Sequence, residues 1–228
     1  ERCEQIQKEW KNAFPLQRLS GVEASPGWVG CGLSHVKAVE EAKARGDPYV
    51  LVWEDDCIPR KRNGESGNVH VIRRMWEQVL SQLSKNLGKW DIVLGATSQV
   101  KGTPVLEPSL SSSLVSVYKL PKGFTTHWTL YNASIYDFII AWKETKPSPI
   151  DVYMYEKARI FVTVPFMAEQ RQGYSLIENE NKDYSMYFNV AESSFRSYGN
   201  TILPVTMPTS AKTITSILPK GSIKLLSL

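Results

Sequence analysis

The sequence lacks the usual features of membrane-spanning, disulfide-rich and nucleic-acid-binding proteins. No apolar run approaches the roughly 20 residues that a membrane-spanning helix needs, which argues against a transmembrane protein. The 27 basic and 23 acidic residues leave a formal charge of +4, too even for a nucleic-acid-binding protein. The three cysteines have unrelated spacings that fit neither a disulfide framework nor a zinc ribbon. We interpret them as buried or incidental thiols.

A secretory signal is also missing from the sequence. We therefore expect a cytoplasmic protein. The chain opens at Glu1 without a methionine, so the lumen of the secretory pathway is the alternative if an upstream signal was removed.

Apolar residues, in contrast, are plentiful. Hydrophobic residues make up 42% and aromatic residues 11% of the 228 positions, which excludes a disordered chain and favours one α/β domain over two. Apolar periodicity predicts buried strands and amphipathic helices in alternation. The predicted strands are 49–53, 90–95, 114–118, 126–131 and 160–165, and the helices are 4–12, 35–45, 69–87 and 135–142. Continuous apolar strands predict an open, mostly parallel α/β sheet with helices on both faces.

The composition changes near the C-terminus. Residues 1–198 are expected to form a single domain. After about Tyr198 the chain is rich in Thr, Ser, Pro and Leu, with lysines but no acid. We expect residues 199–228 to be a C-terminal extension or a linker; an edge strand and a docked segment also fit.

The acidic triplet Glu54, Asp55 and Asp56 is the most informative local feature. It directly follows the apolar run 49–53, and open α/β sheets bind ligands beyond the carboxyl ends of their strands. Alternate side chains of an extended backbone point the same way, so we expect Glu54 and Asp56 to hold one Mn²⁺ or Mg²⁺ ion. Asp55 would then face a sugar or a basic partner. The alternative is a solvated acidic turn.

Several motifs occur in an order typical of one enzyme family. They are LSGVEA at 19–24, GCGLSH at 30–35, YVLVWEDD at 49–56, WDIVLG at 90–95, THWTLY at 126–131 and PID at 149–151. Together with Val164, Pro165, Gln170 and Ser175, they make the chain resemble glycosyltransferase family 25. This family includes lipooligosaccharide and collagen galactosyltransferases and viral relatives. The resemblance covers about residues 1–180 and implies a GT-A type, Rossmann-like fold, a sugar-nucleotide donor and usually Mn²⁺.

The resemblance implies a metal-dependent transferase in glycan biosynthesis, such as that of lipopolysaccharide. It would move a hexose, galactose or glucose, from a uridine diphosphate sugar to a hydroxyl of a glycan or glycoprotein. The bound cation would stabilise the leaving diphosphate. Transfer with inversion needs a carboxylate to take the hydroxyl proton. Asp151, on a Pro-rich turn, is our candidate for this base; a cap of the following helix is the alternative.

Five further residues are candidates for donor or metal binding. Ser34 and His35 lie at a predicted helix start, whose amides can bind phosphate. Gln170 and Ser175 follow the last strong strand and can bond the acceptor or the diphosphate. His127 can complete the metal shell or contact phosphate. A structural role for the histidines is the alternative.

The start of the chain departs from the family pattern. The family opens with a strand of the form vyvINLdrR, part of its nucleotide pocket, whereas this chain begins at what resembles the following helix. This departure and the tail favour a second hypothesis, a glycosyltransferase-like binding or scaffolding module without catalysis. A metal-dependent phosphodiesterase is a third, but the sequence shows no second cluster of carboxylates and histidines.

Overall fold

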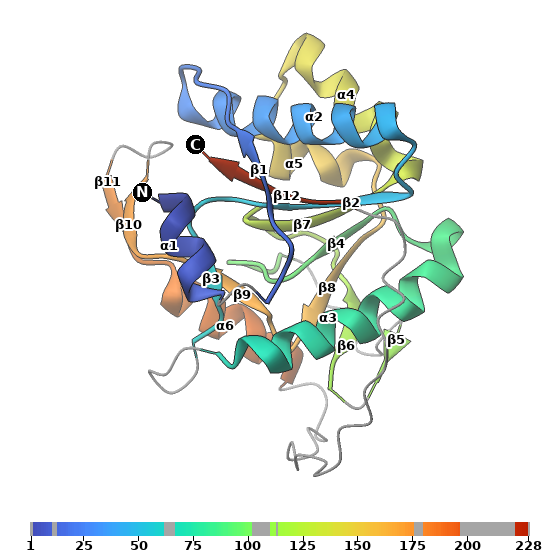
Figure 1. Ribbon diagram of the computed structural model, residues 1–228, viewed down its shortest axis with the longest axis vertical. Helices are drawn as coiled ribbons and strands as arrows, with labels where there is room; N and C mark the ends of the chain where they lie inside the picture. Colours follow the sequence, from blue (N-terminus) through green and yellow to red (C-terminus); the bar gives the residue numbers. More distant parts are fainter. Residues whose placement is uncertain are drawn as a thin grey trace.

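A mixed sheet forms the centre of the molecule (Figure 1). The computed structural model describes residues 2–10, 13–61, 67–101, 110–112, 114–175, 180–196 and 222–227. Among these, eight strands pair in the order β1-β12-β2-β7-β4-β8-β6-β5. Their bounds are β1 (Gln17–Ser20), β2 (Tyr49–Trp53), β4 (Ile92–Leu94), β5 (Leu110–Ser111), β6 (Ser116–Lys119), β7 (Trp128–Asn132), β8 (Ile160–Val164) and β12 (Ser222–Ser227).

Helices and two short antiparallel sheets surround this sheet. The short sheets pair β3 (Cys57–Pro59) with β9 (Ala168–Gln170) and β10 (Gly173–Ser175) with β11 (Glu180–Lys182). The helices are α1 (Arg2–Glu9), α2 (Gly27–Arg45), α3 (Val69–Leu83), α4 (Tyr136–Thr145), α5 (Ile150–Tyr153) and α6 (Ser185–Arg196), with 3₁₀ turns η1 (Ser84–Lys89), η2 (Ala133–Ile135) and η3 (Met154–Glu156). In the described ranges, no helix combines the length and apolar character needed to cross a membrane.

The sheet is mixed, so the expectation of a mostly parallel sheet was wrong. Only the β1–β12, β12–β2 and β4–β8 pairs are parallel among the seven described pairings. Strand β7 runs antiparallel between β2 and β4. A continuous apolar run shows that a strand is covered on both faces, but it carries no information about the direction of the neighbouring strand.

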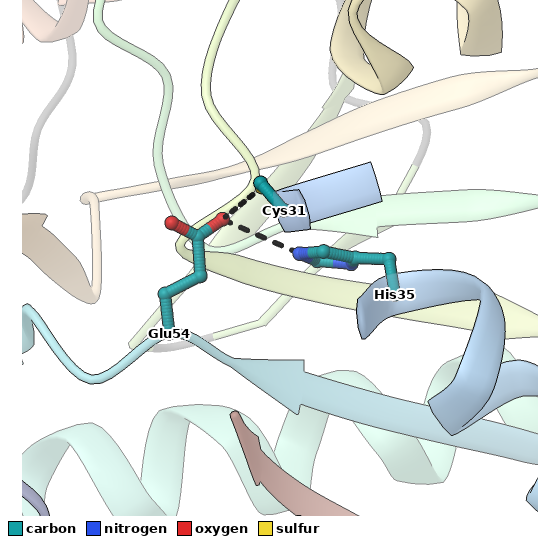
Figure 2. A group of neighbouring side chains, drawn as sticks. All are labelled: Cys31, His35 and Glu54. Atoms are coloured by element: carbon teal, nitrogen blue, oxygen red, sulfur yellow. Dashed lines mark hydrogen bonds and ion pairs between the residues drawn. The ribbon is translucent and has the colours of Figure 1, made fainter. Parts of the chain in front are cut away.

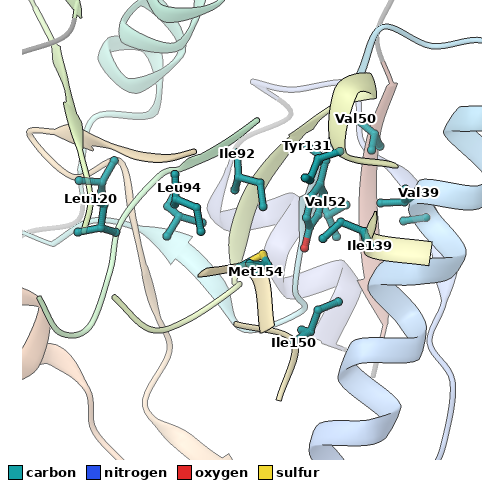
Figure 3. Packing of buried hydrophobic residues seen from close by; sticks show 14 of the residues in the cluster. Val39, Val50, Val52, Ile92, Leu94, Leu120, Tyr131, Ile139, Ile150 and Met154 are labelled. Carbon is teal, nitrogen blue, oxygen red and sulfur yellow. The ribbon is translucent and has the colours of Figure 1, made fainter. Parts of the chain in front are cut away.

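Helices do cover both faces, as expected from the buried strands. Every residue of β2 is buried, and its alternate side chains belong to two separate cores. Val50 and Val52 pack with Val39 of α2 and Ile139 of α4 (Figure 3). The intervening side chains pack with those of α1 and α3. The period of two in a strand therefore assigns each β2 residue to one layer.

Helix α2 packs closely against α4 and begins two turns before the predicted start at His35. It ends as predicted at Gly46, whose left-handed φ of 70° suits glycine. Near its start, a Cβ on Gly32 would lie 2.2 Å from the Trp142 ring of α4. Glycine at this position permits the close approach, which overrides the weak helix propensity of that residue.

The C-terminal strand is an interior part of the sheet. We expected residues 199–228 to be an extension or a linker, but Ser222–Ser227 forms β12, between β1 and β2 and parallel to both. Residues 199–221 lie outside the described residues. The strand brings the end of the chain into the domain that we had expected to stop at residue 198.

Candidate functional site

A cavity of about 700 Å³ opens at the carboxyl ends of β1 and β2. Its wall comes from the segment 20–27 after β1, the first turns of α2, the acidic triplet, and the chain around β10. Gly30 lets the first of these segments rest on α2, because a Cβ there would lie 2.6 Å from the Val22 carbonyl oxygen. The polar and ionisable residues of this wall include Arg18, Cys31, Glu54, Asp55, Asp56, Gln170, Arg171, Ser175, Lys182 and Tyr184.

The acidic triplet forms a tight turn. Strand β2 stops at Trp53, and the Cys57 amide donates to the Glu54 carbonyl at 3.0 Å, which closes a four-residue turn. On the far side of the turn, the Arg171 amide donates to the Asp56 carbonyl at 2.7 Å. Because the backbone is no longer extended after Trp53, the alternation that we extrapolated to Asp56 does not apply there.

The expected metal ligands Glu54, Asp56 and His127 do not form one group of donor atoms, although the Glu54 amide donates to the His127 carbonyl at 3.0 Å. Among the described residues, the set of three donors that lie within 4.8 Å of one another is Cys31, His35 and Glu54. His127 is fully buried beside the Phe188 ring, and it is not among the described residues that line the cavity. Burial lowers the pKa of His127 to about 4, which leaves its ring neutral at pH 7.

Glu54 points into the protein, toward α2 (Figure 2). Its Oε1 atom lies 3.3 Å from His35 Nε2 and 3.8 Å from Cys31 Sγ, and it accepts a hydrogen bond from Thr126 Oγ1. Cys31 and His35 are four residues apart, and therefore share one face of α2. His35 Nδ1 lies 2.9 Å from the Tyr131 hydroxyl. These five side chains make one buried polar network, of which Cys31 and Glu54 reach the cavity wall.

This network shifts the ionisation of its members. Burial opposes the charged form of Glu54, but the hydrogen bond and charge of His35, with Thr126, outweigh it and lower the pKa of that carboxyl. Burial, and next the neighbouring Glu54 charge, raise the pKa of the Cys31 thiol well above its usual value. The network therefore contains an ionised Glu54 carboxylate and a protonated Cys31 thiol beside the His35 ring.

Two of the predicted donor-binding residues serve the structure instead. Ser34 Oγ donates to the Gly30 carbonyl and accepts from the Val22 amide, each at 2.8 Å. Its hydroxyl holds the 20–24 segment on α2, and it caps no helix. His35 belongs to the Glu54 network and, like Ser34, is not among the described residues that line the cavity.

Gln170 and Ser175, in contrast, line the cavity. Gln170 Nε2 donates to Asp56 Oδ2 at 3.3 Å, which links the end of β9 to the acidic turn. Asp55 is buried, Asp56 is half-buried, and both line the same wall. These four predicted residues therefore share one cavity.

The predicted base Asp151 lies outside the cavity wall. It is half-buried in the first turn of α5, and its Oδ2 accepts from the Thr125 amide at 3.3 Å. Burial raises the pKa of this carboxyl, and the Glu54 charge adds to the effect. The cap residue of α5 is Pro149, and Asp151 lies in the first turn, where the Val152 amide also bonds its carboxylate.

The sequence-based predictions missed the basic side of the cavity. Arg18, Arg171 and Lys182 line it, and Arg171 also binds Glu9 and Gln5 of α1 at 2.7 Å. No local sequence motif predicts these residues. Cys31 could have been found, because its spacing of four from His35 is a same-face pair on any helix that includes both.

Comparison with known proteins does not add a relative. Neither a protein-family model nor a curated protein sequence matches this chain. The resemblance to glycosyltransferase family 25 therefore rests on the order of the quoted motifs, and the functional conclusion has to come from the cavity itself.

Proposed function

We propose that the protein is a metal-dependent glycosyltransferase with a GT-A type, Rossmann-like fold. Its donor would be a nucleotide diphosphate sugar, uridine diphosphate galactose or glucose, and its acceptor a hydroxyl of a glycan or glycoprotein. One observation carries the proposal: Asp55 and Asp56 line a cavity of about 700 Å³ at the carboxyl ends of strands. This is the edge where open α/β sheets bind ligands, and the volume is in the range of small-ligand sites.

The remaining cavity wall suits a diphosphate. Gly27, the first residue of α2, lies in the wall, and a helix N-terminus offers free amides and a positive dipole to an anion. Arg18, Arg171 and Lys182 add positive side chains. The family pattern has an N-terminal strand beside the nucleotide pocket. Strand β12 is our candidate to take its place in space, because Ser227 pairs with Ser20, which lines the cavity.

Asp56 is the residue of the acidic turn that fits a divalent cation here. Its carboxylate is a hard oxygen donor, and Mn²⁺ or Mg²⁺ completes its shell with phosphate oxygens and water. When bound, the cation supplies charge that stabilises the leaving diphosphate. Gln170 orients Asp56 through its hydrogen bond. Glu54, turned toward α2, is left out of this ligand set.

The base that inversion requires has two candidates. Asp55 lines the cavity, whereas Asp151 lies behind its wall. A general base must come within hydrogen-bond reach of the acceptor hydroxyl, which favours Asp55. Turnover of Asp55→Asn and Asp151→Asn variants, each compared with its binding of uridine diphosphate, separates the two. The base is the residue whose variant binds the nucleotide but loses turnover.

The test is metal-dependent nucleotide binding and sugar transfer. Calorimetry with uridine diphosphate is run with Mn²⁺ and with chelator, followed by a panel of sugar nucleotides assayed for transfer and donor hydrolysis. We expect binding that requires Mn²⁺ and is lost in Asp56→Ala. The matched control is Glu156→Ala, an exposed acid in η3, which should bind as wild type does.

Three results separate the hypotheses. Unchanged binding and turnover in Asp56→Ala would contradict the role of the acidic turn. Wild-type protein that neither binds nucleotide nor hydrolyses any donor with Mn²⁺ would contradict glycosyl transfer. Metal-dependent binding without turnover, unaffected by Asp151→Asn, would favour the non-catalytic binding module.

A further inference from the structure

The buried group Cys31, His35 and Glu54 is not used by the proposed transfer reaction. We propose that these three residues bind a zinc-class transition metal ion, with a fourth position open to the cavity. The site shares Glu54 with the acidic turn but differs from it in chemistry, because it combines a thiol, an imidazole and one carboxylate. Such mixed sulfur and nitrogen donors select Zn²⁺ and similar ions over Mn²⁺ or Mg²⁺.

The distances between the donor atoms fit a tetrahedral ion. Typical zinc bonds of about 2.05 Å to nitrogen, 2.1 Å to oxygen and 2.3 Å to sulfur give tetrahedral edges of about 3.4 Å for N···O and about 3.6 Å for S···O. The observed separations are 3.3 Å between His35 Nε2 and Glu54 Oε1, and 3.8 Å between Cys31 Sγ and the same oxygen. Both agree to about 0.2 Å, and the third pair, Cys31 Sγ and His35 Nε2, lies within 4.8 Å.

Neighbouring groups already orient the ligands. Metal-binding histidines use their second ring nitrogen for a hydrogen bond that fixes the tautomer. His35 Nδ1 lies 2.9 Å from the Tyr131 hydroxyl, so Nε2 is the nitrogen directed at Glu54. Thr126 Oγ1 contacts both other ligands, at 3.9 Å from Cys31 Sγ and within hydrogen-bond distance of Glu54 Oε1. The supporting shell of the site is therefore present.

The site also has an entry path. Cys31 and Glu54 both line the large cavity, whereas His35 lies deeper. An ion entering from the cavity meets the thiol and carboxylate first, and its open position then faces the cavity. Three protein ligands with one open position is the arrangement of catalytic zinc sites.

Binding has a simple proton balance. The ion forms bonds to Cys31 Sγ, His35 Nε2 and Glu54 Oε1, and the Cys31 thiol releases its proton to solvent. The ion also displaces the proton from His35 Nε2, and the ring keeps one proton on Nδ1, which it donates to the Tyr131 oxygen. The positive ion then replaces the hydrogen bond between His35 and Glu54 as the group that neutralises the buried carboxylate.

Cobalt titration tests the proposal on the full chain. The protein is stripped with a chelator, kept reduced and titrated with Co²⁺ in the absence of nucleotide, and then with Zn²⁺. We expect a thiolate-to-cobalt charge-transfer band that saturates at one ion per chain and disappears when Zn²⁺ displaces Co²⁺. Cys31→Ala should abolish the band. Cys57→Ala is the matched control, since Cys57 is the other described buried free cysteine and lies outside the group.

A second variant keeps the test decisive if Cys31→Ala does not fold. Tyr131→Phe removes only the oxygen that orients His35, and should weaken Co²⁺ binding about 10- to 100-fold. Absence of the band in wild-type protein, its persistence in Cys31→Ala or its loss in Cys57→Ala would overturn the proposal. So would an unchanged affinity in Tyr131→Phe. The titration contains no nucleotide, so its failure leaves the glycosyltransferase test unaffected.

Discussion

Arg60 gives the sharpest stability prediction. It follows β3, and its side chain is 3% exposed. Its guanidinium donates to Glu169 of β9 and, at 3.3 Å, to Glu192 of α6, and a further nitrogen donates to Asn189. The proposed change is Arg60→Met, which keeps an apolar side chain of similar length and removes the charge. Two carboxylates, 3% and 5% exposed, then lose their counter-ion.

The expected cost follows from this burial. Removing one partner of a buried ion pair costs about 3–5 kcal/mol, because the remaining charge is left without compensation. Two carboxylates are left here, so we expect about 4–5 kcal/mol. Burial already raises the pKa of Glu169 even with Arg60 present. A loss of this size is a large share of the roughly 5–15 kcal/mol that stabilises a domain.

Urea unfolding followed by circular dichroism measures the loss. With a slope of about 2 kcal/mol per molar urea, the midpoint of Arg60→Met should fall by about 2 M. Adding Glu169→Gln and Glu192→Gln should restore at least half of the loss, because neutral amides remain hydrogen-bonded without charge. The control is Arg73→Met, whose pair with Glu77 is more than one-third exposed and should matter by less than about 1 kcal/mol. A cost below about 1 kcal/mol for Arg60→Met, or no rescue, would refute the reasoning.

Two further predictions concern Gly95 and Asp91, which flank the central strand β4. Gly95→Ala should cost about 1–3 kcal/mol, seen as a lower Tm, because a Cβ there would lie 2.6 Å from Cγ of the buried Trp128. Asp91 is the second case: burial disfavours its charge, but hydrogen bonds, chiefly from Arg159, outweigh it and hold the pKa of Asp91 below the usual 3.8. Its ionised form therefore stabilises the protein at neutral pH, and this contribution is lost as the pH falls through the lowered pKa. The difference in unfolding free energy between wild type and Asp91→Asn should be largest near pH 7 and should shrink steadily as the pH falls below about 4; a difference that does not shrink in acid would contradict it.

Long apolar runs made the central strands predictable. The expected strands at 49–53, 90–95 and 160–165 correspond to β2, β4 and β8, because a strand buried on both faces is apolar at every position. Short strands such as β1 and β3 have three or four residues and too few periods to stand out. Strand direction was not predictable, because the hydrophobic pattern is the same for parallel and antiparallel neighbours.

The site was predictable only as far as the backbone stays regular. The rule of alternation assigns Glu54 to the same face as Val52, and the side chain does face α2. One residue later the chain turns, so Asp56 does not follow the rule. We expected His35 near a phosphate because we predicted that the helix begins at residue 35. Helix α2 instead begins at Gly27 and includes Gly30 and Gly32. Those glycines are there for packing, which a single sequence does not show.

The place of β12 has a consequence for biosynthesis. It is the last described strand to leave the ribosome, yet it lies between β1 and β2, which are made early. Until it arrives, these two strands have open facing edges, and such edges pair readily with other chains. The β1–β12–β2 part of the sheet can close only after all the other described strands have been translated. A nascent chain would therefore gain from a chaperone that shields this gap, and the edge of the sheet that borders the cavity is completed last.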